Sequence, residues 1–132
     1  PLSLGRTYPV NSPRELLYQQ RMHVLSDLES VMTRQEMPCT IAQRWSEYAL
    51  SDILWLLYAV TVKLIHRSLL GLGVLEKEYL IYTFFVQAWR AEYLFGLLDS
   101  IQVLIKKLQQ NVPLNSALAL ERVLLDYLEG QH

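Results

Sequence analysis

Residues 51–70 are the feature that most constrains the fold, because every face of a helix formed there is hydrophobic. From Ile53 to Val62, only Thr61 is neither apolar nor aromatic. A helix that is apolar all round is either a membrane span or the buried centre of a helical domain. A span needs about 20 consecutive apolar residues, and the cations that begin at Lys63 interrupt this run. We therefore predict a central core helix that is covered by neighbours on several sides.

Size and composition agree with a single helical domain. The chain has 132 residues, of which 52% are hydrophobic, and glycine and proline are scarce. The formal net charge of −1 gives no overall attraction towards nucleic acid or acidic lipid. The single cysteine, Cys39, suits a reducing compartment, and no signal peptide or transmembrane segment is recognisable, so we expect a cytoplasmic location. Because the chain begins with Pro1 rather than Met, we also expect an excised fragment.

Periodicity and capping residues predict the other helices in the first half of the chain. Ser12 followed by Pro13 is a helix start, and the apolar stripe behind it predicts one helix to about Arg34. The sequence Thr-Ile-Ala-Gln at residues 40–43 is a capping box that predicts a second, short helix, in which Trp45 is a core anchor.

In the second half, a glycine pair at Gly71 and Gly73 ends the central helix, and another helix is predicted to start near Glu76. We expect a bend within residues 88–96, a helix over residues 97–110, and a final helix capped by Asn115. No stretch alternates apolar and polar residues for long enough to indicate a strand. The sequence thus predicts an all-α fold, a compact bundle of five to six helices around the buried central helix.

Residues that could carry chemistry are few. The histidines lack metal-ligand spacing and Cys39 has no nearby Cys or His, so we expect no metal, no cofactor and no catalytic residue. A basic patch for nucleic acid would have to come from a few side chains, which also suit the negative ends of their helices. These side chains are Lys63, His66, Arg67, Lys106 and Lys107. What remains is an excess of apolar residues, which favours a protein interface and hence an assembly module.

Five segments resemble one known family in their order and spacing. Residues 111–121 and 123–125, Asn-Val-Pro-Leu-Asn-Ser-Ala-Leu-Ala-Leu-Glu and Val-Leu-Leu, resemble the end of bacterial clamp-loader subunits. Ala-Gln-Arg-Trp at 42–45, ahead of Leu-Trp-Leu-Leu at 54–57, is similar to a passage of the delta-prime subunits of DNA polymerase III. Pro-Leu-Ser-Leu at 1–4 resembles the end of the lid domain that precedes the last domain of those subunits. The aromatic-rich residues 79–93 depart from the family by being longer and bulkier.

The resemblance implies a clamp-loader collar domain over residues 11–132, with residues 1–10 left over from the lid domain or linker. Such a domain is not an enzyme; it joins the tau/gamma and delta subunits in a hetero-pentamer that loads the sliding clamp onto primed DNA. It would meet DNA only through that complex, with no membrane and no small-molecule ligand. The ATP and zinc sites belong to the preceding part of such subunits. We expect exposed polar positions of the last two helices to form the subunit interface. These positions are Gln102, Lys106, Gln109, Arg122 and Asp126.

Two alternatives stay open. The chain could be a small-molecule-binding regulatory domain of a transcription regulator, in which the aromatics of residues 79–93 line a cavity instead of filling a core. It could also be an enzyme that uses Cys39 or a histidine, which is the least favoured of the three hypotheses.

Overall fold

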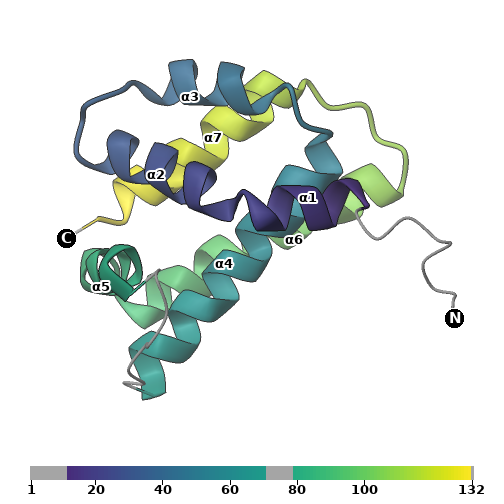
Figure 1. Ribbon diagram of the computed structural model, residues 1–132. Helices are drawn as coiled ribbons and strands as arrows, with labels where there is room; N and C mark the ends of the chain where they lie inside the picture. The colour runs from purple at the N-terminus through teal and green to yellow at the C-terminus, as the bar shows by residue number, and fades with distance from the viewer. Residues whose placement is uncertain (1–11, 71–78, 132) are drawn as a thin grey trace, which may run out of the picture.

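A computed structural model describes residues 12–70 and 79–131, which form seven α-helices and no strand (Figure 1). The prediction of an all-α fold is confirmed. In chain order the helices are α1 (Pro13–Gln19), α2 (Arg21–Met32), α3 (Pro38–Trp45), α4 (Leu50–Leu70), α5 (Tyr79–Ala88), α6 (Ala91–Gln109) and α7 (Ser116–Glu129). The segments at 1–10, Gly71, Gly73 and Glu76, for which the sequence made predictions, lie outside the described residues.

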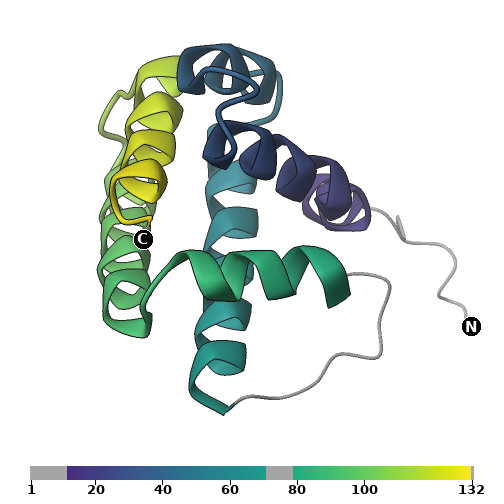
Figure 2. The same ribbon diagram turned by 90° about the vertical axis from the view of Figure 1, so that its left-hand side faces the viewer.

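Helix α4 is the predicted core helix. It packs against α1, α5 and α6, and Figure 2 shows α5 crossing it while α6 runs beside it. Its buried side chains are Leu50, Ile53, Leu54, Leu56, Leu57, Val60, Thr61, Leu64 and Ile65. At about 100° per residue they cover roughly half of the helix circumference, and the side that carries Trp55 is only half-buried. The hydrophobic run therefore organises the core of the domain.

Within the described ranges, no single helix is long and apolar enough to cross a membrane. The pair Pro38–Trp45 and Leu50–Leu69 would be long and apolar enough together, but the two helices are bent by 119° relative to each other.

The predicted helix from Ser12 to Arg34 is in fact two helices. Ser12 caps α1 as expected, because its Oγ accepts a hydrogen bond from the Glu15 amide at 3.2 Å. At Gln20, however, the backbone leaves the helical region (φ −99°, ψ 16°), and α2 starts afresh at Arg21. The break lets α1 pack on α4 while α2 packs on α3 and α7. The single-helix prediction was wrong because the apolar stripe continues across a break that no Gly or Pro marks.

Helix α3 begins two residues before the predicted capping box. Pro38 occupies its first turn and the extended Met37 precedes it, so no side chain caps this helix. The prediction that Trp45 is a core anchor is confirmed: its ring is fully buried and its Nε1 donates to Asp27 Oδ2 at 3.0 Å. Arg44 bridges Asp27 and Glu36 at 2.7 and 2.8 Å, which ties α2, α3 and their connection together.

The bend expected within residues 88–96 is a break between α5 and α6 at Trp89 and Arg90. Buried hydrogen bonds anchor the chain there. Trp89 Nε1 donates to the Tyr127 carbonyl oxygen at 2.7 Å, and the Tyr127 hydroxyl meets Thr61 Oγ1 at 2.7 Å. Stacked against Trp89 is Phe85, with ring centroids 5.6 Å apart. These contacts join α4, α5 and α7.

The turn between α6 and α7 is fixed by caps at both ends. Asn111 adopts a left-handed conformation (φ 61°), and the Val112 amide donates to the Lys107 carbonyl at 2.9 Å, which is the Schellman pattern of a helix end. Asn115 then caps α7, since its Oδ1 accepts from the Leu118 amide at 3.0 Å. The predicted Asn115 cap is confirmed.

Candidate interaction surface

Three of the five predicted interface residues share one side of α6. Gln102, Lys106 and Gln109 are exposed, and their spacing of four and three residues places them along one face. The amide of Gln102 donates from Nε2 to the Tyr58 hydroxyl on α4 at 3.2 Å, so this face borders α4. Gln109 lies one turn further towards the end of α6 and borders a cleft.

The other two predicted residues, Arg122 and Asp126, lie on α7 beside a hollow that α6 also lines. They form an ion pair at 3.1 Å, with 66% of the Arg122 side chain exposed but only 20% of that of Asp126. Asp126 is therefore half-buried, which corrects the expectation of an exposed position. Burial raises its pKa, against the lowering effect of Arg122. Its backbone oxygen accepts a hydrogen bond from the Tyr93 hydroxyl, whose pKa burial also raises.

The five residues do not form one surface. The α6 residues that line the hollow include Gly96 and Ser100, whereas Gln102 and Lys106 lie elsewhere on the helix. At about 100° per residue, these two groups are separated by roughly a third of a turn around α6. The structure therefore divides the predicted interface into a part that borders α4 and a part that borders α7.

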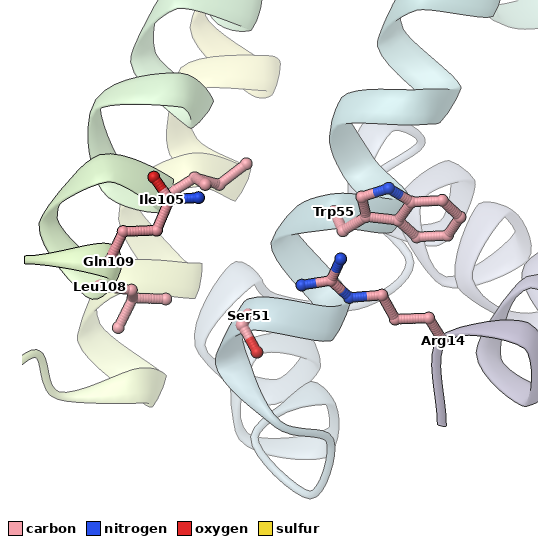
Figure 3. A pocket seen from close by; sticks show the side chains of 6 residues that line it. All are labelled: Arg14, Ser51, Trp55, Ile105, Leu108 and Gln109. Carbon is pink, nitrogen blue, oxygen red and sulfur yellow. The ribbon is translucent and has the colours of Figure 1, made fainter. Parts of the chain in front are cut away.

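A cleft of about 250 Å³ opens between α1, α4 and α6 on the side of Gln109 (Figure 3). Its lining residues are Arg14, Ser51, Trp55, Ile105, Leu108 and Gln109. In this view Trp55 lies on α4 close to Arg14, and Ile105 and Leu108 lie on α6 across from α4. The walls are mainly apolar, with a guanidinium and an amide at the rim. Such a cleft suits an apolar side chain of a partner flanked by polar groups.

Arg14 is held at this rim by two contacts. Its Nε donates to Asp52 Oδ1 at 3.1 Å, and its guanidinium carbon lies 5.9 Å from the centroid of the Trp55 ring. The Tyr18 ring, also on α1, packs against Trp55 in an edge-to-face arrangement at a centroid distance of 6.2 Å. Trp55 was predicted to lie in a core helix covered on several sides. The half-buried Trp55 belongs to the part of α4 that borders this surface cleft, which Arg14 of α1 also lines.

The candidates for chemistry stay apart. Cys39 is exposed in the first turn of α3, and His23 and His66 are exposed on α2 and α4. In residues 12–70 and 79–131, no group of three or more His, Cys, Asp or Glu could hold a metal ion.

The basic residues are divided as well. Trp55 of α4 and Leu108 of α6 line the same cleft, and Tyr58 further along α4 bonds Gln102, which comes earlier in α6, so α4 and α6 run antiparallel. Lys63 and Arg67 consequently lie at the opposite end of this helix pair from Lys106 and Lys107. The fold therefore does not unite these cations into one basic patch of the kind that nucleic acid needs.

Comparison with protein-family models, with curated proteins and with solved structures found no match to this chain.

Proposed function

We propose that this chain is the C-terminal collar domain of a clamp-loader subunit of the delta-prime type, which assembles the complex that places the sliding clamp on primed DNA. The observation that carries the proposal is that segments that resemble the family belong to one packed unit. Residues 42–45 end α3, residues 54–57 lie in α4, and residues 111–125 form the capped entry to α7 and most of that helix. Helix α3 packs on α7, and Thr61 of α4 bonds Tyr127 of α7.

The surface supports an assembly role. Phe95, Val103, Val112 and Leu118 are large apolar side chains that stay at least a third exposed on the last two helices and the turn between them. Gln102 and Lys106 are exposed polar side chains on the same helix as Phe95 and Val103. Large apolar side chains left exposed beside polar ones are typical of protein interfaces. The partners in this proposal are the C-terminal domains of the tau/gamma and delta subunits, and DNA is met only through the assembled complex.

The aromatic packing favours assembly over the alternative of a ligand-binding regulator. Phe85 and Trp89 are at most 1% exposed and stack on each other, and Trp89 also packs against Tyr127 at a centroid distance of 5.4 Å. These rings fill the core between α4, α5 and α7. Under this proposal Cys39→Ser should leave the function of the chain unchanged, because the exposed thiol takes no part in the proposed interface. Loss of an activity with the fold intact would support the enzyme alternative instead.

A matched pair of substitutions tests whether the cleft that Gln109 borders takes part in partner binding. Gln109→Arg adds bulk and charge at the rim of the cleft, while Gln43→Arg makes the same change at an exposed position of α3. We expect Gln109→Arg to weaken binding to the tau/gamma and delta C-terminal domains at least about tenfold and Gln43→Arg to leave it unchanged. Binding is measured by titration calorimetry against the two neighbours together. If the parent chain bound neither neighbour, the proposed function would be wrong.

A further inference from the structure

One face of α6 carries exposed apolar side chains between charged ones. Glu92, Phe95, Asp99, Val103 and Lys106 follow one another at intervals of three or four residues, so they lie along one side of the helix. Phe95 is 48% exposed and Val103 is 51% exposed, and the three charged side chains are exposed as well. We refer to these five residues as the α6 stripe.

The α6 stripe faces away from the rest of the domain. The buried residues of α6, Leu94, Leu97 and Ile101, lie on the opposite side of the helix and face the core. Figure 2 shows α6 at the edge of the molecule, and its neighbours α4 and α7 flank it. Within the described residues, neither Asp99 nor Lys106 forms an ion pair. The stripe thus offers apolar side chains and uncompensated charges to a partner.

Acidic and basic side chains lie towards opposite ends of the stripe. Glu92 and Asp99 lie in the N-terminal half of α6, and Lys106 and Lys107 lie in its last turn. A second copy of α6 that ran parallel would set like charges side by side, whereas an antiparallel copy would set acidic side chains against basic ones. Opposite charges at close range favour one register and disfavour others. A two-fold axis relates two copies in this antiparallel way, which is the commonest symmetry of protein dimers.

We propose that the α6 stripe is a self-association surface, through which two copies of this chain pair with their α6 helices antiparallel. The axis passes beside Val103, so that the Val103 side chains of the two copies meet. Asp99 precedes Val103 by four residues and Lys106 follows it by three, about 6 Å and 4.5 Å along the helix, which brings each Asp99 opposite the second copy's Lys106. The pairing therefore brings the two Val103 side chains together and matches acid with base.

The size of the stripe sets the strength of the association. A helix of 19 residues is about 28 Å long, and one face of it buries less area than the roughly 1,200–2,000 Å² of a stable specific interface. We therefore expect a dimer that forms in the micromolar to millimolar range of chain concentration. This inference concerns the chain alone and does not depend on the proposed clamp-loader role.

Sedimentation equilibrium over a range of concentrations tests the dimer. The parent chain should show a monomer–dimer equilibrium. Val103→Arg places two like charges at the axis and should weaken dimerisation at least about tenfold. Leu118→Arg is the matched control, since Leu118 is 65% exposed on α7, outside the stripe, and it should leave the dimer unchanged. Thermal melts verify that both variants fold.

Charge reversal tests the antiparallel register. Asp99→Lys and Lys106→Glu should each be monomeric alone, because each homodimer would contain two like-charge contacts. An equimolar mixture of the two variants should dimerise again, because a heterodimer restores both opposite-charge contacts. A parent chain that stayed monomeric at millimolar concentration, or a dimer that persisted in Val103→Arg, would overturn the proposal. Failure of the mixture to dimerise would overturn the antiparallel register.

Discussion

The buried hydrogen bond between Thr61 and Tyr127 predicts that two conservative substitutions have unequal effects. Both side chains are fully buried, and Thr61 Oγ1 lies 2.7 Å from the Leu57 carbonyl oxygen and 2.7 Å from the Tyr127 hydroxyl. A carbonyl can only accept, so the single Thr61 hydroxyl hydrogen goes to Leu57. Tyr127 must then be the donor to Thr61. Thr61→Val and Tyr127→Phe each remove one end of this bond.

The two substitutions differ in whether they leave a buried hydroxyl without a hydrogen-bond partner. Tyr127→Phe removes the donor and leaves Thr61 bonded to Leu57, so the free energy of unfolding should fall by about 1 kcal/mol. Thr61→Val leaves the buried Tyr127 hydroxyl without its acceptor, and the free energy of unfolding should fall by about 2–3 kcal/mol. In the double variant no hydroxyl is left unpaired. The double variant should therefore be no less stable than Thr61→Val, with a coupling of about 1–2 kcal/mol.

Urea denaturation followed by circular dichroism measures all four proteins of this cycle, and equal m-values verify that they unfold alike. Trp89 and Phe85 provide no alternative partner for the hydroxyl, because the Trp89 Nε1–H donates to the Tyr127 carbonyl oxygen. Equal losses in the two single variants, combined with additive behaviour in the double variant, would refute the assignment of donor and acceptor.

Three further predictions concern pH, the core helix and the end of α7. Burial raises the pKa of Tyr127 above its unfolded value of about 10. The stability that this group contributes is therefore complete below about pH 10 and is lost as the pH rises towards the folded pKa. Tyr127→Phe should accordingly reduce the fall of the urea midpoint at alkaline pH. Leu57→Asp puts an unpaired charge in the core and should abolish the cooperative thermal transition, while a melt near the parent temperature would contradict its burial. A Cβ at Gly130 would lie 1.8 Å from the Tyr93 ring, so Gly130→Ala should lower the urea midpoint, but not in a Tyr93→Ala background.

The sequence predicted those parts of the fold that local chemistry determines. The caps at Ser12 and Asn115 and the apolar length of α4 depend on residues close together in the chain, and all three predictions were confirmed. The break at Gln20 was missed because it serves tertiary packing: α1 and α2 turn towards different helices. The start of α3 was misplaced because a plausible capping box followed a proline that begins the helix itself.

The candidate surface was less predictable for a similar reason. Arg14 and Asp52 are 38 residues apart, and only the packing of α1 on α4 brings them together beside Trp55. No local spacing indicates such a cleft. Helical periodicity alone could have shown that Gln102 and Lys106 share a face, but the place of Asp126 depends on Tyr93 of another helix. Near a helix–helix contact, the side chains of the neighbouring helix decide whether a polar residue is exposed, and the sequence pattern of its own helix does not.

The most direct test of the central claim is the mass of a mixture. This chain is combined with the tau/gamma and delta subunits of the same source, and light scattering after size exclusion gives the mass of each species. If the chain is a clamp-loader collar domain, it should elute in a heteromeric complex, and Gln109→Arg should shift it out of that complex while Gln43→Arg remains bound. A chain that elutes apart from both neighbours at every concentration would contradict the account.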